Sequence, residues 1–173
     1  GRLSEEKGIM TLIKSFKYGI SLPIKIAGTG PLEKNIKEYI SENHINNIEL
    51  LGYKQGEELT KLIKEAYFII VPSECYENNP MSIIEAYSYG IPVIGSKIGG
   101  IPEIIKEKET GYTFPMGNSK ELAKLIKQIE SLSDEEYLHL CKNCIAYAKE
   151  DMSKESYYKR LISFYKRILS QKK

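Results

Sequence analysis

Short apolar segments alternate with segments of helical periodicity along the first two thirds of the chain, and this alternation constrains the fold more than any other feature. The apolar segments are four or five residues long and most are rich in isoleucine and valine. They lie at residues 23–27, 47–51, 68–71, 91–95 and 111–114. Strands that alternate with helices form parallel sheets with right-handed crossovers, and continuously apolar strands indicate that helices cover both faces. The sequence therefore predicts an α/β fold with a Rossmann-like parallel sheet flanked by helices.

Apolar residues also repeat at helical spacing between these strands and throughout the last third of the chain. In the first helical segment, Ile9, Leu12, Ile13 and Phe16 follow the i, i+3, i+4, i+7 pattern. Helices are predicted at residues 7–18, 32–43, 57–66, 81–89, 101–106, 119–130, 134–149 and 154–170. The 173 residues fit a single domain. We expect residues 1–117 to form its α/β core and residues 118–173 to form a helical C-terminal extension.

The stretch from Glu77 to Glu85 is the strongest candidate for a functional site. It follows the third apolar segment and opens a helical one, which predicts a strand, a loop and a helix in succession. Asn79 is predicted as the N-cap and Pro80 as the first helical residue, and a helix start of this kind favours a phosphate. A carboxylate on each side suits a ligand with hydroxyls at both ends and phosphates in the middle, such as a nucleotide sugar. The alternative is an ordinary solvated helix start with two exposed acids.

Other candidate residues follow the ends of the predicted strands. Gly28, Gly52, Ser73 and Gly95 each lie at such a position. Ligands of open parallel sheets bind at the carboxyl ends of the strands, so these residues are expected along one edge with the Glu77–Glu85 stretch. The pair Gly99-Gly100 is predicted to form a turn into the next helix.

Composition argues against several classes of protein. The net charge is only +2, so nucleic acid is not expected as a partner, and no segment approaches the ~20 apolar residues of a transmembrane helix. No signal peptide is visible, and the start at Gly1 suggests a segment of a longer protein. The odd count of three cysteines in a lysine-rich chain suggests a reducing cytoplasm. Cys141 and Cys144 are expected in the core, because a zinc site would need two more ligands nearby.

Several motifs together resemble one enzyme family. Glu77 and Glu85 are followed by Ala86 and by Gly-Ile-Pro-Val-Ile at residues 90–94. Further matching motifs lie, in the family's order, at residues 1–8, 28–32, 51–53, 72–73 and 99–103. This pattern, which covers essentially the whole chain, resembles the C-terminal, donor-binding domain of retaining GT-B glycosyltransferases of family 4 (glycosyl transferases group 1). The resemblance implies the C-terminal half of a GT-B fold, with the acceptor-binding N-terminal domain outside this chain.

The resemblance also assigns roles to individual residues. It implies that Arg2 and Lys7 bind the donor diphosphate, that Glu77 takes hydroxyls of the donor sugar, and that Glu85 takes those of the ribose. Arg2, Lys7 and Glu77 are the expected catalytic residues. The cationic Arg2 and Lys7 could stabilise the charge that builds on a leaving diphosphate. The chain has no Asp-x-Asp pair that could hold Mg²⁺, so neither a metal nor a cofactor is expected. The expected donor-binding residues are Gly28, Thr29, Gly30, Tyr53, Lys54, Asn78, Asn79, Pro80, Met81, Ser82 and Glu85.

Some of these residues have a second interpretation. Lys7 at a helix start would oppose the helix dipole, which favours a functional role for it. The Gly28-Thr29-Gly30 segment could let the backbone approach a ligand closely, although a lone Gly-x-Gly is more often a tight turn. Tyr53 lies where relatives place the nucleobase, and it could equally be a half-buried aromatic. Asn78 and Asn79 replace the glycine and the bulky apolar residue of many relatives, which leaves the identity of the sugar open.

The resemblance implies transfer of a hexose or N-acetylhexosamine, with retention of configuration, from a nucleotide diphosphate sugar. UDP is expected as the nucleotide from its frequency in the family. The acceptor would be lipid-linked or a polysaccharide, in bacterial surface polysaccharide (O-antigen or capsule type) biosynthesis, and this fragment alone is expected to be inactive. The alternatives are a GT-B epimerase or sugar-phosphate synthase and, in another class, a non-catalytic nucleotide-binding sensor domain.

The last predicted helix has an apolar face and a basic face, the latter with Lys159, Arg160, Lys166 and Arg167. The basic face is expected to be solvated, and contact with an anionic membrane surface is the alternative. In GT-B enzymes the final helix commonly crosses back to the N-terminal domain, in which case part of its apolar face would be exposed in this chain. The expected location is cytoplasmic, with peripheral contact at the inner face of the plasma membrane as a variant.

Overall fold

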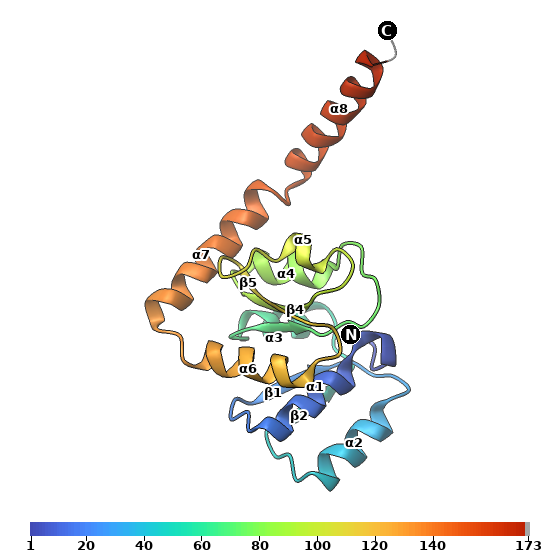
Figure 1. Ribbon diagram of the computed structural model, residues 1–173, viewed down its shortest axis with the longest axis vertical. Coiled ribbons are helices and arrows are strands. Elements are labelled where there is room, and N and C mark those ends of the chain that lie inside the picture. The colour runs from blue at the N-terminus through green and yellow to red at the C-terminus, as the bar shows by residue number, and fades with distance from the viewer. Residues whose placement is uncertain (172–173) are drawn as a thin grey trace.

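The computed structural model describes residues 1–171, in which short strands and helices alternate as far as residue 118 and helices follow (Figure 1). In chain order the elements are η1 (Glu5–Lys7), α1 (Ile9–Ser15), η2 (Phe16–Tyr18), β1 (Ile24–Ala27), α2 (Glu33–Glu42), β2 (Ile48–Gly52), α3 (Gly56–Lys64), β3 (Ile69–Val71), α4 (Met81–Ser88), β4 (Val93–Ser96), α5 (Ile101–Ile104), β5 (Gly111–Phe114), α6 (Ser119–Glu130), α7 (Asp134–Glu150) and α8 (Lys154–Ser170). Every predicted strand and helix is present, and the predicted α/β class is confirmed.

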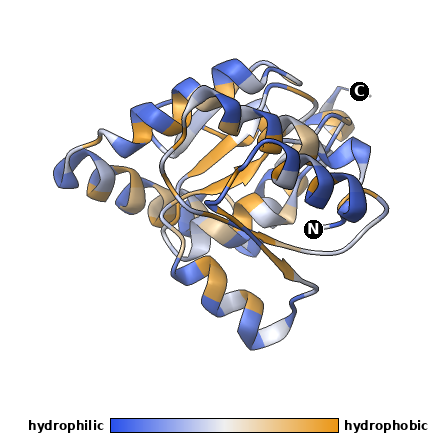
Figure 2. Ribbon diagram, turned by 90° about the horizontal axis from the view of Figure 1, so that it is seen from below, coloured by the Kyte–Doolittle hydropathy of each residue, from blue (hydrophilic) through white to orange (hydrophobic). Residues whose placement is uncertain are grey.

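The strands form two parallel sheets within the described residues. β1 pairs with β2 in one sheet, and β3, β4 and β5 form the other in that order. The single predicted sheet is therefore divided into two, one with β1 and β2 and the other with β3, β4 and β5, and side-chain packing joins them. Ile26 of β1 and Ile94 of β4 belong to the same buried cluster. The strands are predominantly hydrophobic in Figure 2, whereas the helices carry both hydrophobic and hydrophilic residues, as expected for strands covered by amphipathic helices.

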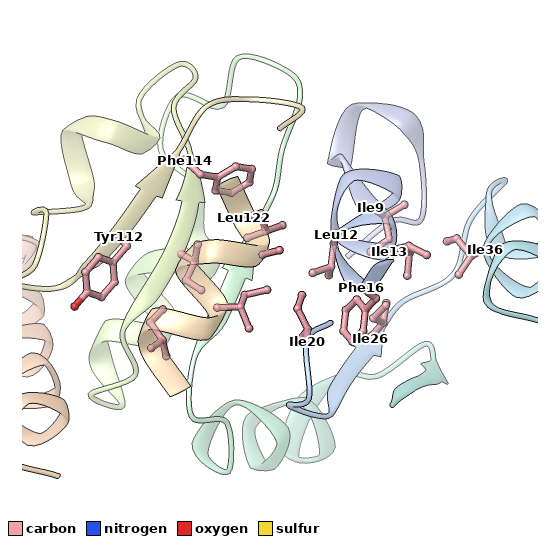
Figure 3. Packing of buried hydrophobic residues seen from close by; sticks show 14 of the residues in the cluster. Ile9, Leu12, Ile13, Phe16, Ile20, Ile26, Ile36, Tyr112, Phe114 and Leu122 are labelled. Atoms are coloured by element: carbon pink, nitrogen blue, oxygen red, sulfur yellow. The ribbon is translucent and has the colours of Figure 1, made fainter. Parts of the chain in front are cut away.

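One core cluster joins the first helix of the chain to α6. The predicted stripe of α1 is buried, with Ile13 fully enclosed and Leu12 only 4% exposed. It packs near Leu122 and Ile126 of α6, which are equally buried (Figure 3). Although α6 opens the segment expected to form a helical extension, its apolar face is part of the core.

A second core cluster fixes α4, the helix that follows the Glu77 loop. Ile83, Ala86 and Tyr87 of α4 are fully buried in it, together with Cys144 of α7. The Tyr87 hydroxyl lies 2.8 Å from Oγ1 of Thr110, and burial raises the Tyr87 pKa well above its ordinary value. This hydrogen bond between two buried groups fixes the rotation of α4 about its axis.

The last helix extends away from the rest of the chain (Figure 1). α8 has the predicted bounds and no buried residue, and large apolar side chains such as Tyr157, Phe164 and Tyr165 are about half exposed or more. The exposure of its apolar face in this chain is as expected. No helix among residues 1–171 is long and apolar enough to cross a membrane.

Thiol labelling provides a test of this packing. Cys144 is fully buried, its thiol donates to the Thr110 carbonyl oxygen at 3.4 Å, and burial raises its pKa to about 12. Burial also raises the pKa of Cys141, which is only half-buried, as is Cys75. Because the thiolate is the reactive form, iodoacetamide at pH 8 should modify Cys75 and Cys141 in the native protein and reach Cys144 only after unfolding.

The measurement is mass spectrometry of labelled peptides over time, with the protein in urea as the control for full reactivity. Modification of Cys144 in the native protein as fast as that of Cys75 would contradict the buried position of Cys144.

Candidate functional site

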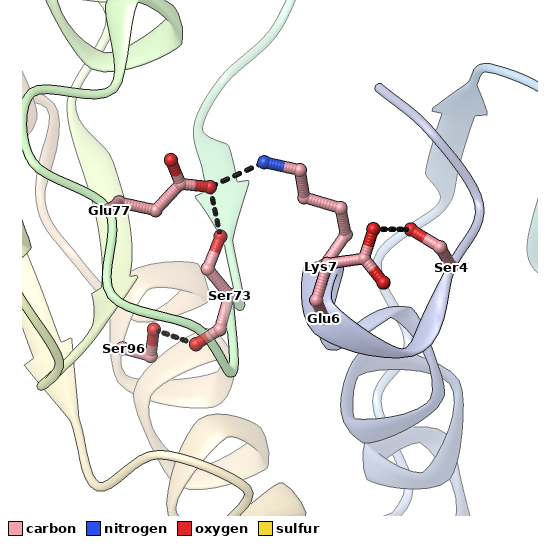
Figure 4. A network of polar contacts seen from close by, with 6 residues as sticks. All are labelled: Ser4, Glu6, Lys7, Ser73, Glu77 and Ser96. Atoms are coloured by element: carbon pink, nitrogen blue, oxygen red, sulfur yellow. Dashed lines mark hydrogen bonds and ion pairs between the residues drawn. The ribbon is translucent and has the colours of Figure 1, made fainter.

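Lys7 and Glu77, which are far apart in the sequence, meet in the folded chain. Nζ of Lys7 lies 2.5 Å from Oε1 of Glu77, and the hydroxyl of Ser73 donates to the same carboxylate oxygen at 3.2 Å (Figure 4). The hydrogen bond to Glu77 holds the pKa of Lys7 above its ordinary value. The Lys7 and Glu77 side chains remain 40% and 20% exposed, respectively. Two of the three predicted catalytic residues are thus in direct contact at a surface that a ligand can reach.

The segment that carries Lys7 is a short 3₁₀ turn followed by a sharp break at Gly8. Gly8 has φ +62°, and a side chain there would collide with the carbonyl oxygen of Pro72. The predicted helix over residues 7–18 is therefore interrupted, and Lys7 lies in the last turn of η1 rather than at a helix start. Lys7 thus ends η1 and directly precedes Gly8, the N-cap of α1, instead of opening one continuous helix as predicted.

Further hydrogen bonds fasten the Lys7 segment to the Glu77 loop. The amide of Glu74 donates to the Glu6 carbonyl oxygen at 2.9 Å, and the buried Thr11 hydroxyl donates to the Glu74 carboxylate at 2.5 Å. The Glu6 carboxylate accepts from the Ser4 hydroxyl at 2.7 Å, which lowers the Glu6 pKa. These contacts explain how two segments without regular structure hold Lys7 and Glu77 together.

The start of α4 differs from the prediction by one residue. Pro80 has extended ψ of 111°, and its carbonyl oxygen accepts from the amide of Ile83, so Pro80 occupies the N-cap position and Met81 is the first helical residue. Asn79 is not the N-cap, because the cap residue is the one whose carbonyl accepts the first helical hydrogen bond. Met81 is 67% exposed, and Asn78, Asn79, Ser82 and Glu85 are also exposed.

The glycines after β1 serve the protein's own backbone. A side chain on Gly28, with φ +147°, would collide with the backbone of Gly1, and one on Gly30 would collide with that of Leu3. Leu3 is tied to this loop because its amide donates to the Thr29 carbonyl oxygen at 2.9 Å. Close approach of the segment around Arg2 is therefore one reason for both glycines, and their expected role in donor binding stays a prediction. Arg2 itself is exposed beside this loop.

The residues after β2 are accessible. Tyr53 is 66% exposed and its hydroxyl donates to Oε1 of Gln55 at 3.0 Å, so the interpretation as a half-buried aromatic was wrong. Nζ of Lys54 lies 3.4 Å from Oε2 of Glu58, one helical turn away. Both residues follow the carboxyl end of β2, as the Glu77 loop follows that of β3.

Sequence reasoning missed a contribution from the segment after β4. The fully buried Ser96 hydroxyl donates to the Ser73 carbonyl oxygen at 2.5 Å, and the Gly100 amide donates to the Glu77 carbonyl oxygen at 2.7 Å. The signal was the pair Gly99-Gly100, which was interpreted as a turn and as part of a family motif but was given no role at the site.

Two surface cavities lie away from Lys7 and Glu77. One of about 420 Å³ is bordered by His44 and Ile45, and an adjoining one of about 630 Å³ also includes Ser21 and Asn47. These residues precede β1 and β2, so both cavities are at the edge of the sheet opposite to Lys7 and Glu77. We place the candidate site at the carboxyl edge because that is where the charged pair and the strand ends meet. Within residues 1–171 no group of three or more His, Cys, Asp or Glu side chains is arranged to hold a metal ion.

The domain has a parallel α/β fold, and charged side chains lie at the carboxyl ends of its strands. Domains of this kind bind a ligand at that edge. Residues 1–151 match the family model described as glycosyl transferases group 1. The chain belongs to this family, which confirms the family resemblance at that level.

The curated relatives are glycosyltransferases as well. The chain is 24% identical over 172 residues to the putative colanic acid biosynthesis glycosyltransferase WcaL of Escherichia coli, a match that covers 94% of this chain and 42% of WcaL. It is 30% identical over 138 residues to the amylovoran biosynthesis glycosyltransferase AmsK of Erwinia amylovora, covering 74% of this chain and 34% of AmsK. The chain thus spans less than half the length of these relatives.

Solved structures support the fold. HepE of Anabaena, in complex with UDP-glucose, superposes with a TM-score of 0.77 at 23% identity, covering 86% of this chain and 42% of HepE. The C-terminal domain of the glycosyl transferase group 1 family protein LpcC of Francisella tularensis gives a TM-score of 0.75 at 19% identity, covering 86% of this chain and 81% of that domain. These likenesses establish the GT-B type of fold for the described domain.

Proposed function

We propose that this chain is the donor-binding, C-terminal domain of a retaining, family 4 glycosyltransferase. The donor would be a nucleotide diphosphate sugar, with UDP as the nucleotide and a hexose or N-acetylhexosamine as the sugar. The acceptor would be a polysaccharide or a lipid-linked glycan of a bacterial surface polysaccharide pathway. The names of WcaL and AmsK support the pathway class, and the complexes of HepE with UDP and UDP-glucose support the donor.

The observation that carries this proposal is the contact between Lys7 and Glu77. Because Nζ of Lys7 and Oε1 of Glu77 are 2.5 Å apart, a diphosphate bound at Lys7 would place its attached sugar within reach of the Glu77 carboxylate. Lys7 and Arg2 would then stabilise the charge that develops on the leaving diphosphate. Glu77 would accept hydrogen bonds from sugar hydroxyls, and Glu85 from the ribose.

Two further parts of the proposal concern what lies around this site. The two cationic side chains would do the work that a metal ion does in other transferases, so the reaction would need no metal. The acceptor would bind on an N-terminal domain, and the present chain alone would bind donor without transferring sugar. The whole protein would work in the cytoplasm, with a lipid-linked acceptor presented at the inner membrane surface.

Calorimetric titration of this chain with UDP, GDP and ADP, with and without EDTA, tests the proposal. Selective binding of UDP that EDTA does not change is the expected result. Tighter binding of GDP or ADP would overturn the choice of nucleotide, and a loss of binding in EDTA would overturn metal independence. Absence of binding by all three nucleotides would contradict a donor site on this chain.

Product analysis with the full-length protein separates the remaining enzyme classes. Transfer of sugar to a glycan acceptor is expected. A free epimerised sugar or a sugar phosphate would identify the epimerase or synthase alternative, and donor binding without turnover would identify the sensor.

A further inference from the structure

We propose that Gly99 and Gly100, which connect β4 to α5, are positioning residues that hold the Glu77 carboxylate in place for the donor sugar. This inference rests on the proposed function, because it assigns to the two glycines an effect on a ligand of the Glu77 loop. Both residues belong to the family motif at residues 99–103, but neither is among the residues expected to bind the donor.

The glycine pair is in direct backbone contact with the loop. The Gly100 amide donates to the Glu77 carbonyl oxygen at 2.7 Å. A Cβ atom on Gly99 would collide with the Glu77 carbonyl oxygen and lie 2.8 Å from its amide nitrogen, and one on Gly100 would collide with the Asn78 carbonyl oxygen. All of these neighbours are main-chain atoms, so no side-chain rotation could relieve the collision and the loop itself would have to move.

Backbone conformation alone does not explain why position 100 is a glycine. Gly99 has φ +55°, where glycine is favoured for its own conformation. Gly100 has φ −81° and ψ −5°, an ordinary right-handed conformation that any residue adopts. The contact that forbids a side chain at Gly100 is the one with Asn78, so the close approach of the loop is the reason for this glycine.

The same connection fastens the loop at a second point. Ser96, fully buried at the end of β4, donates to the Ser73 carbonyl oxygen, and the Ser73 hydroxyl donates in turn to the Glu77 carboxylate at 3.2 Å. Glu77, which the family resemblance places on the donor sugar, is therefore held by β4 and the segment that follows it, through both its side chain and its main chain. Displacements of about 1 Å at a reacting group can cost as much as about 100-fold in rate, so a shift of this loop should affect sugar recognition.

The test compares Gly100→Ala and Gly99→Ala with Gly117→Ala. Gly117 has φ +71° and open space around it, so its substitution reproduces the strain expected at Gly99 without the collision. We expect the affinity for UDP-glucose relative to that for UDP, measured by calorimetry, to fall about threefold or more in both loop variants, in line with a partial loss of oriented contacts. The ratio should stay at the wild-type value in Gly117→Ala. An unchanged ratio in Gly100→Ala would overturn the inference.

A double-mutant cycle separates positioning from general damage. If Gly100 acts through Glu77, then Gly100→Ala should have no further effect on the ratio in a Glu77→Gln background, whereas a full additional effect would contradict the proposal. Should Gly100→Ala fail to fold, amide NMR of the wild type provides the readout. The Gly100 amide should shift more with UDP-glucose than with UDP, and equal shifts would overturn the inference. Wild-type protein that binds neither ligand would refute the proposed function itself, irrespective of the glycine variants.

Discussion

Replacement of Lys7 by alanine is expected to weaken UDP binding about 10- to 100-fold. A hydrogen bond to a charged group contributes roughly 1.5–3 kcal/mol, and each 1.4 kcal/mol is about tenfold in affinity. The substitution would also leave Glu77 without its cationic partner beside the diphosphate, which adds repulsion in the same direction. Because the Lys7 pKa is raised, the lysine charge is present throughout the neutral range. It is lost only as the pH rises beyond the ordinary lysine range, so the affinity should be constant between about pH 7 and 9.

The matched control is Lys14→Ala, which removes the same charge from an exposed position in α1. Lys14→Ala should leave UDP binding within about twofold of the wild type, since surface charges distant from a ligand are screened by salt. The measurement is calorimetric titration of the wild type, Lys7→Ala and Lys14→Ala with UDP at one salt concentration. Equal losses in both variants would show that net charge, rather than the position of Lys7, governs binding.

Replacement of Phe114 by alanine is expected to lower the free energy of unfolding by about 3–5 kcal/mol, the usual cost of removing a buried aromatic ring. Phe114 ends β5 and is fully enclosed in the cluster that contains α1 and α6. The surrounding side chains come from several elements, so the cavity could not be closed by the movement of one of them. Urea denaturation, with the midpoint and the slope fitted together, gives the measurement.

Phe164→Ala provides the control, because Phe164 is 48% exposed on α8. This substitution should change the free energy of unfolding by about 0.5 kcal/mol or less, as is usual for surface positions. A loss as large as that of Phe114→Ala would mean that the Phe164 side chain packs against something in solution.

Much of the fold could be predicted because strand and helix periods are local properties. The strand over residues 111–114 and the helices over residues 119–130 and 154–170 have the predicted bounds. The division into two sheets could not be predicted, because alternation indicates parallel strands but does not say which pairs share hydrogen bonds. The interruption at Gly8 depends on the Pro72 carbonyl oxygen, more than sixty residues away, and no local pattern contains that information.

The structure brings two of the expected site residues, Lys7 and Glu77, into contact, but it tests the role of none of them. The contact between Lys7 and Glu77 agrees with the expectation that both belong to one site, and their roles stay predictions. Asn79 was assigned the cap because asparagine is a common N-cap residue, yet the extended conformation of Pro80 decides where the helix begins. The glycines after β1 were expected to let the backbone approach a ligand. The structure places the backbone of residues 1–3 against them, and their role in donor binding stays a prediction. For Asn79 the neighbouring residue Pro80 determined the local structure, and for the glycines a tertiary contact did so. Local sequence preference indicates neither.

The division of the sheet suggests how a ligand at the candidate site would affect the stability of the domain. The Lys7 segment is hydrogen-bonded both to the loop after β1, through Leu3, and to the loop after β3, through Glu6. The contact between Lys7 and Glu77 therefore adds to the bonds that join the two sheets where no strand ladder does within the described residues. A ligand that binds both would act as a clamp between the two halves of the domain. Such a clamp resists unfolding by RT ln(1 + [L]/Kd), or about 2.7 kcal/mol at a hundredfold excess over Kd. The domain would then resist unfolding most strongly while the donor is bound, and less strongly each time the nucleotide leaves.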